Sequence, residues 1–121
     1  MRDQNNPQES QFSEQIASGM RTAILNREID PNSELPSLRE MSTETGHSVN
    51  TVKAAYEILR KEGLISKPGG LTSRYRVTSS PWLHSRLYSI KDDIENFFSS
   101  MQAKGYSRLE VLSVINKEII K

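Results

Sequence analysis

Residues 35–64, LPSLREMSTETGHSVNTVKAAYEILRKEGL, carry the start and stop signals of two short helices around a tight turn. Ser37 and Glu40 have the S-x-x-E spacing of a capping box, which predicts that the first helix begins there. Gly46 is suited to end it, and Ser48 is suited to start the second helix. Two short helices joined in this way are typical of a helix-turn-helix.

The second helix, expected over residues 48–62, has one apolar face and one polar end. Its apolar face consists of Val52, Ala55, Tyr56 and Leu59, which recur at helical spacing. Asparagine can pair with adenine, serine and threonine can bond to bases or phosphates, and a helix N-terminus favours phosphate. The candidate DNA contacts near this end are Ser48, Val49, Asn50, Thr51 and Lys53, with Arg39 of the preceding helix.

Each of these side chains also has a purely structural explanation, which the sequence leaves open. Ser48 can act only as a helix cap. Lys53 can pair with Glu57 one turn later, and Arg39 can pair with a glutamate of its own helix. Asparagine and threonine at a helix start can also be simple solvated residues.

Residues 64–77 have a strand-type pattern around the turn signal Pro68-Gly69-Gly70. They predict a β-hairpin directly after the second helix, which is called a wing. Lys67, Arg74 and Arg76 make the hairpin basic, and Arg74 is a further candidate DNA contact. Residues 48–79 carry six Lys and Arg against two Asp and Glu, a net charge of +4, while the whole chain has +1. The basic excess therefore lies where a phosphate-facing surface is expected.

The rest of the N-terminal half completes one domain. Residues 1–9 are expected to be a flexible leader. An amphipathic helix is expected from about Ser10 to near Arg27, followed by a turn at Asp30-Pro31-Asn32-Ser33. The sequence thus predicts a mainly α fold with a small β-hairpin, in which a winged helix-turn-helix domain spans residues 10–79.

The tail, residues 80–121, has a heptad pattern. Pro81 suits the first turn of a helix, Gly105 ends it, and Ser107 with Glu110 forms a capping box for a last helix. A sustained heptad seam predicts a two-helix dimerisation domain, although the seam can instead pack on its own winged-helix domain. The expected dimerisation residues are Leu83, Leu87, Ile90, Ile94, Phe97, Met101, Leu112, Ile115 and Ile119.

Several functional classes lack support in the sequence. The absence of cysteine excludes disulfides, zinc–thiolate sites and thiol catalysis. The two histidines, His47 and His84, lie far apart, and no phosphate loop, nucleophile elbow or metal cluster is present, so we expect neither an enzyme, a cofactor nor a metal. No apolar run is long enough to span a membrane and no signal peptide is present, so we expect a cytoplasmic, nucleoid-associated protein without membrane contact.

The segment from Phe12 to Ile65 resembles the N-terminal domain of GntR-family bacterial transcription regulators, with the match extending over about residues 11–78. The resemblance rests on QIA in the first helix, LPSLREMS, the G-x-S-x-N-T-V-x-x-A stretch from Gly46 to Ala55, and EGLI before the wing. It implies DNA contacts by Arg39 and by the four polar or basic residues 48, 50, 51 and 53. It also implies that the wing tip near Gly69 and Gly70 enters the minor groove.

This sequence departs from the family pattern at three places. Val49 stands where the family often has arginine, so a guanine contact is replaced by apolar contact with a thymine methyl or is missing. The wing reads GGLTSRY instead of a tighter Gly-x-Gly, and His47 follows Gly46 in place of an apolar residue.

The short tail resembles the YtrA-type branch of the family, whose members are homodimeric and in many cases repress transporter operons. Two helices are too few to enclose a typical metabolite pocket. The sequence therefore does not indicate which small-molecule effector the protein would bind. The sequence therefore predicts a homodimeric DNA-binding regulator, a repressor of a transporter or metabolic operon acting at a palindromic operator. The alternative is a winged-helix module for protein assembly that does not bind DNA.

Overall fold

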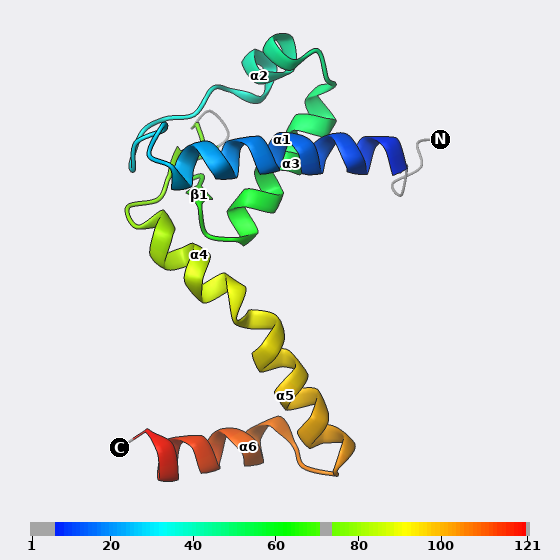
Figure 1. Ribbon diagram of the computed structural model, residues 1–121, viewed down its shortest axis with the longest axis vertical. Coiled ribbons are helices and arrows are strands. Elements are labelled where there is room, and N and C mark those ends of the chain that lie inside the picture. Colours follow the sequence, from blue (N-terminus) through cyan, green and yellow to red (C-terminus); the bar gives the residue numbers. More distant parts are fainter. Residues whose placement is uncertain (1–6, 71–73, 121) are drawn as a thin grey trace. The chain divides into compact units, whose positions relative to one another are not determined.

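The computed structural model describes residues 7–70 and 74–120, which form two compact units that divide after Arg86 (Figure 1). Each unit is described by itself. The first contains α1 (Pro7–Leu25), α2 (Leu38–Thr45), α3 (Val49–Lys61), β1 (Ile65–Ser66), β2 (Arg76–Val77) and most of α4 (Pro81–Ser89). The second contains α5 (Lys91–Ala103), α6 (Arg108–Val114) and a final π-helical turn, Ile115–Ile119. The mainly α fold with a small hairpin is confirmed.

The core of the first unit lies where α1 packs across α3 (Figure 1). The apolar stripe predicted for the second helix of the helix-turn-helix is buried, with all four of its side chains fully covered. Burying a large apolar side chain contributes about 1.5–3 kcal/mol relative to leaving it exposed. The remaining buried core residues are Ala17, Met20, Ile24, Leu35, Leu64, Ile65, Tyr75 and Val77.

The caps of α2 and α3 form as the sequence predicts. Ser37 Oγ accepts a hydrogen bond from Glu40 N at 3.1 Å, and Ser37 N donates to Glu40 Oε1 at 2.8 Å. Gly46 has φ +77°, the left-handed conformation that lets the chain leave α2 at low cost. Ser48 Oγ then accepts from Thr51 N at 3.1 Å and caps α3. Short-range hydrogen bonds therefore fix the turn between the two helices.

The limits of α1 differ from those predicted. It begins at Pro7 rather than near residue 10, because proline is favoured in a first helical turn. It ends at Leu25, and Arg27 has φ +66°. Three residues of the predicted leader, 7–9, are therefore helical, while residues 1–6 lie outside the described residues.

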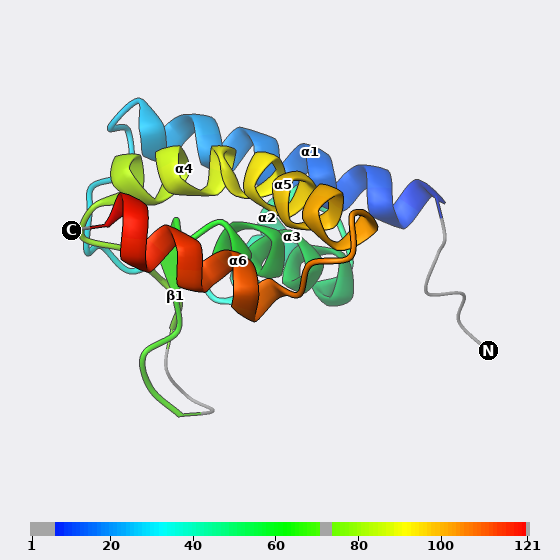
Figure 2. The ribbon, with the colours of Figure 1, turned by 90° about the horizontal axis from the view of Figure 1, so that it is seen from below.

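The two-stranded hairpin is extended by an isolated bridge between Glu34 and Arg76. Ile65 of β1 pairs with Val77 of β2 in an antiparallel register. The opposite edge of β2 binds residues 32–35, with Leu35 N donating to Tyr75 O at 2.8 Å and Val77 N donating to Ser33 O at 3.0 Å. The sequence predicted only a turn near this segment. Figure 2 shows the chain after β1 reaching away from α1 and α3.

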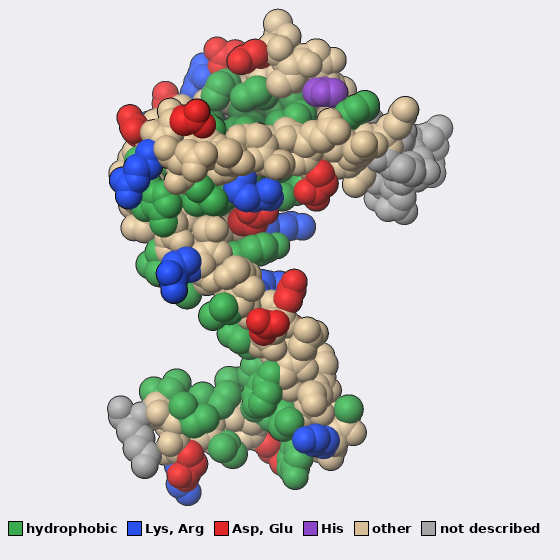
Figure 3. Space-filling view, in the orientation of Figure 1, with side chains coloured by type: hydrophobic (Ala, Val, Ile, Leu, Met, Phe, Trp, Pro, Cys, Tyr) green, Lys and Arg blue, Asp and Glu red, His purple; other side chains and the backbone are tan. Residues whose placement is uncertain are grey.

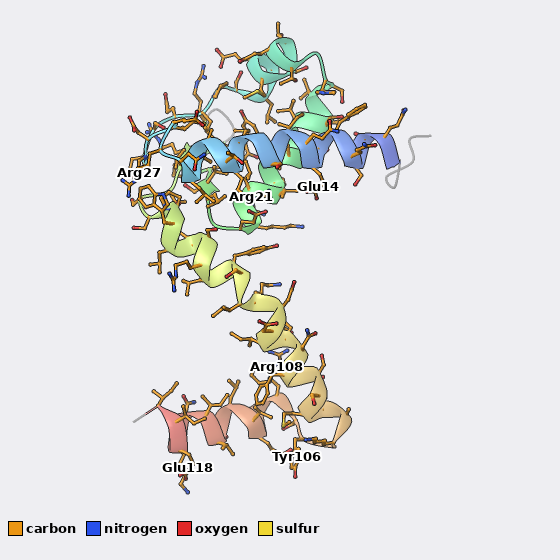
Figure 4. All side chains as sticks on the ribbon, in the orientation of Figure 1. Glu14, Arg21, Arg27, Tyr106, Arg108 and Glu118 are labelled. Atoms are coloured by element: carbon orange, nitrogen blue, oxygen red, sulfur yellow. The ribbon has the colours of Figure 1, made fainter. Side chains whose placement is uncertain are left out.

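The first turn of α4 packs against the winged helix. Pro81 is buried, and Trp82 Nε1 donates to Leu25 O at 3.2 Å. The Arg27 guanidinium lies 4.1 Å from the centre of the Trp82 ring, at the end of α1 where Figure 4 labels it. Gly63, with φ +81°, faces His84 so closely that an added Cβ would lie 2.9 Å from the His84 side chain. The compact unit thus continues beyond residue 79.

The predicted single heptad helix is wrong, because a turn residue, Ile90, separates α4 from α5. Ile90 has φ −95° and ψ −4° and precedes α5. Asp92 and Asp93 in the first turn of α5 favour a new helix N-terminus there, through their interaction with the helix dipole. A pattern of apolar spacing does not detect such a restart.

Within the second unit, α6 packs against α5. Phe98 of α5 and Val111 of α6 are buried. The Arg108 guanidinium lies 4.4 Å from the centre of the Phe98 ring, and its Nη2 is 3.1 Å from Glu95 Oε2 (Figure 4). Ser107 and Glu110 form the predicted capping box at the start of α6.

Candidate nucleic-acid interface

The first turn of α3 presents small side chains to solvent. Ser48, Val49 and Asn50 are exposed, and so are Lys53 and Ala54 one turn later. They lie on the helix side that is opposite to or flanks the buried stripe. This end of α3 therefore offers hydroxyl, amide, methyl and ammonium groups on one narrow surface, which is what reading DNA from a helix N-terminus requires.

Thr51, which the sequence predicts as a DNA contact, is mostly buried. Thr51 is 5% exposed, and its hydroxyl lies 2.9 Å from Ser48 Oγ. Its backbone oxygen accepts a hydrogen bond from Ser13 Oγ of α1 at 3.1 Å. Thr51 precedes Ala55 by one turn and extends the buried face, so the same spacing that identified the stripe could have placed it inside.

Arg39 and Lys53 keep their charges available. Across residues 7–70 and 74–120, neither has an ion-pair partner, so the internal pairs considered for them do not form. Glu57 instead binds Arg60 at 3.0 Å and accepts from the Tyr75 hydroxyl at 3.2 Å. These two contacts offset the Glu57 carboxylate charge, which would otherwise repel phosphate.

The wing arginines are engaged within the protein. Arg74 Nη1 lies 2.6 Å from Glu40 Oε1, and Arg76 Nη2 lies 3.3 Å from Glu34 Oε2. Hydrogen bonding from the Ser37 backbone and then from Arg74 lowers the pKa of Glu40. Arg74 therefore holds the wing against the start of α2.

An open hollow of about 520 Å³ lies beside this ion pair. It is lined by Ser37, Arg39, Glu40, Thr43 and Arg74. Ser37 and Arg39 lie at the start of α2, so the N-terminal turn of that helix adds to the polar surface that begins at α3.

Gly69 and Gly70 lie on the exposed arm that leaves β1. An added Cβ on Gly70 would meet no atom within 4 Å, so space does not require glycine there in the free chain. Residues 71–73 of the predicted wing lie outside the described residues.

Two aromatic contacts hold the candidate interface in place from the protein side. The sequence did not predict either contact. Tyr56 donates its hydroxyl to Pro36 O at 2.8 Å and meets Tyr75 edge to face, with ring centres 5.0 Å apart. Phe12 of α1 packs against His47, with ring centres 4.7 Å apart. These contacts join α1, α3, the chain before α2 and the wing, so they set the angle at which α3 is presented.

The second unit has a continuous apolar surface. Hydrophobic side chains gather over α5 and α6 (Figure 3), around a groove of about 420 Å³. Most of the predicted dimerisation side chains are exposed in the single chain, while Met101 and Ile115 are half-buried. The exposed ones are Leu83, Leu87, Ile90, Ile94, Phe97, Leu112 and Ile119.

Comparison with known proteins identifies the domain that carries this interface. Residues 12–70 match the model of bacterial regulatory proteins of the gntR family. Residues 12–70 therefore form a GntR-family domain. No significant match was found among curated proteins. GntR regulators are DNA-binding transcription factors and not enzymes, in agreement with the predictions from sequence.

Solved structures of GntR regulators have the same fold. A GntR family transcriptional regulator from Listeria monocytogenes is 24% identical, with 96% of this chain and 98% of that chain covered and a TM-score of 0.55. YtrA from Sulfolobus acidocaldarius, a GntR-family transcription factor, is 27% identical, with 90% of both chains covered and a TM-score of 0.51. The GntR assignment agrees with the resemblance inferred from the sequence, and the YtrA-type branch is consistent with it.

In the part of the chain that the structure describes, no group of acidic or histidine side chains is arranged to hold a metal ion. No described helix is both long enough and apolar enough to cross a membrane.

Proposed function

We propose that this GntR regulator is a homodimeric repressor of a transporter or metabolic operon and acts at a palindromic operator. In this proposal α3 lies in the major groove and the wing lies in the minor groove. The similarity to YtrA along nine-tenths of both chains supports the choice of branch. The role as a repressor rests on the resemblance of the short tail to the YtrA-type branch.

The observation that carries the proposal is the exposed start of α3. Ser48, Asn50 and Lys53 project from one end of a helix whose other side is wholly buried. The helix N-terminus adds a partial positive charge and free backbone donors. Lys53 has no carboxylate partner in the described chain, so its charge is available to phosphate.

Val49 defines the specificity that we propose. It is 41% exposed and follows the capping Ser48 directly. A valine side chain offers no hydrogen bond, but it can pack on the methyl group of thymine. We therefore expect a thymine at this point of each half-site, where relatives with arginine would select guanine.

The apolar surface of the tail supports a dimer. Leu87 is 54% exposed and Ile94 is 46% exposed in the single chain. Exposed apolar surface of this kind is stabilised when a second copy covers it. A two-fold dimer also matches the symmetry of two half-sites about one helical turn apart.

A salt titration of binding to random duplex DNA tests the proposal. Contacts with phosphate release counterions, so affinity should fall steeply as salt rises. The competing function is a winged-helix assembly module. Absence of any DNA affinity at low salt would favour that module and would contradict the proposed regulator.

A further inference from the structure

Two hydroxyl groups at the start of α3 are bonded to each other. Ser48 Oγ and Thr51 Oγ1 are 2.9 Å apart, and Ser48 Oγ also accepts from Thr51 N at 3.1 Å. Ser48 is exposed, whereas Thr51 is buried at 5% exposure. One member of the pair therefore faces the proposed DNA surface, and the other faces the protein interior.

The buried position of Thr51 decides which hydroxyl donates. A hydroxyl group has one proton to donate and two lone pairs that accept. Within the described chain, Ser48 Oγ is the only acceptor that the Thr51 hydroxyl reaches. If Thr51 accepted instead, its own proton would be buried without a partner, at a cost of about 1–3 kcal/mol. Thr51 is therefore the donor.

This arrangement leaves the Ser48 hydroxyl with a single remaining hydrogen-bonding role. Its oxygen accepts both the N–H and the O–H of Thr51, which occupies its two lone pairs. Only the proton of Ser48 remains available, and it faces solvent. We infer that Thr51 is a positioning residue that makes Ser48 an obligate hydrogen-bond donor, so that Ser48 selects an acceptor on DNA. This inference rests on the proposed DNA-binding function.

A donor-only Ser48 can contact fewer kinds of group on DNA. A serine hydroxyl can ordinarily bond to either donors or acceptors on base edges. An obligate donor cannot bond to the amino groups of adenine and cytosine, but it can donate to a phosphate oxygen, a purine N7, guanine O6 or thymine O4. Contact with a base makes binding depend on the DNA sequence, whereas contact with the phosphate backbone does not. This difference distinguishes the two kinds of acceptor.

Three single variants and one double variant test the coupling. Thr51→Val keeps the shape of the buried side chain but removes its hydroxyl, while Thr51→Ser keeps the hydroxyl. Ser48→Gly removes the contacting group at a position where glycine is tolerated as a helix cap. The probe is a duplex that the wild type selects from a random pool, with a random duplex as comparison. Thermal melting establishes that each variant is folded.

We expect Thr51→Val to bind the selected duplex roughly two- to tenfold more weakly, the range for one neutral hydrogen bond, and Thr51→Ser to bind like the wild type. Adding Thr51→Val to Ser48→Gly should cause no further loss, because Thr51 acts through Ser48. A loss that is equal on both duplexes would place the acceptor on the backbone, and a loss confined to the selected duplex would place it on a base. Both results support the donor role.

Unchanged binding by Thr51→Val, or losses that multiply in the double variant, would overturn the inference. A second measurement without DNA examines the hydroxyl pair itself. By NMR, the Thr51 hydroxyl proton should exchange slowly with water and the Ser48 proton rapidly, and the reverse order would also overturn it. If the wild type bound no duplex, the proposed function would fail, while proton exchange would still decide which hydroxyl donates.

Discussion

Tyr56 shows how one side chain can set the geometry of the whole interface. It is fully buried in α3, donates its hydroxyl to Pro36 O at 2.8 Å and contacts Tyr75 of the wing. Its hydroxyl therefore links α3 to the chain that enters α2. Burial raises the pKa of Tyr56 to about 12 from an ordinary value of 10.0.

That pKa shift predicts a loss of stability at alkaline pH. The neutral phenol is favoured in the folded chain, so the stabilisation is complete below pH 10 and is lost as pH rises towards about 12. Tyr56→Phe loses the hydrogen bond to Pro36, which costs about 0.5–1.5 kcal/mol at neutral pH, but it has no phenol to ionise. Denaturant unfolding at several pH values should therefore show the two proteins converging in stability above pH 10. A constant difference would contradict the assignment.

The sequence predicted the role of a single residue well where its hydrogen-bond partner lies only a few positions away. Ser37 bonds to Glu40 and Ser48 bonds to Thr51, each across three residues, so the spacing alone revealed the caps. Thr51 itself was assigned to the DNA surface because its polar side chain obscured its place on the buried face. Its contact with Ser13, 38 residues away, could not be read from local sequence.

At the scale of elements, the wing is attached to α2 by Arg74 and Glu40. The side chains of this pair are 42% and 56% exposed, so the ion pair contributes little to folding stability. It does decide where the Arg74 charge lies. A phosphate group that approaches the wing must compete with Glu40 for that guanidinium.

Glu40→Gln should therefore strengthen non-specific DNA binding. Glutamine can still accept the hydrogen bond from Ser37 N, but it no longer neutralises Arg74. If Arg74 then gains a phosphate, the slope of log affinity against log salt should become steeper by about one. Fluorescence anisotropy with a random duplex measures this slope.

The control adds Arg74→Ala to Glu40→Gln. This double variant should lose the steeper slope, because the effect depends on the freed guanidinium. If the double variant kept the steeper salt slope, Glu40 would act only by repelling DNA. The ion pair that attaches the wing to α2 would then have no part in binding.

Elements with strong local signals were predicted, whereas their long-range pairing was not. The α2–turn–α3 segment and the hairpin follow from caps, glycine positions and apolar spacing. The pairing of residues 32–35 with the chain at β2 depends on backbone hydrogen bonds between residues 40 or more positions apart. The interruption at Ile90 escaped prediction because the heptad pattern continues through it.

At the scale of the whole molecule, the proposal requires two copies of the chain. Ile94→Glu places a carboxylate on the exposed apolar face of α5, and burying that charge against a second copy would be strongly unfavourable. We expect monomers with much weaker operator binding. Sedimentation velocity reports the oligomeric state, and Leu87→Glu should behave in the same way.

Asn96→Glu provides the matched control for Ile94→Glu. It adds the same charge to α5 at an exposed position outside the heptad seam. This variant should keep both the dimer and DNA binding. An unchanged dimer for Ile94→Glu would instead show that the tail face is not the interface between copies.

The most direct test of the central claim compares two lysines of α3. Lys53 lies near the proposed DNA-reading end and Lys61 ends the helix, and both are exposed. We predict that Lys53→Ala weakens binding to random duplex and reduces the salt slope by about one, whereas Lys61→Ala leaves the slope unchanged. Equal slopes for the wild type and Lys53→Ala, or a loss only in Lys61→Ala, would contradict the claim that α3 meets DNA through its N-terminal turns.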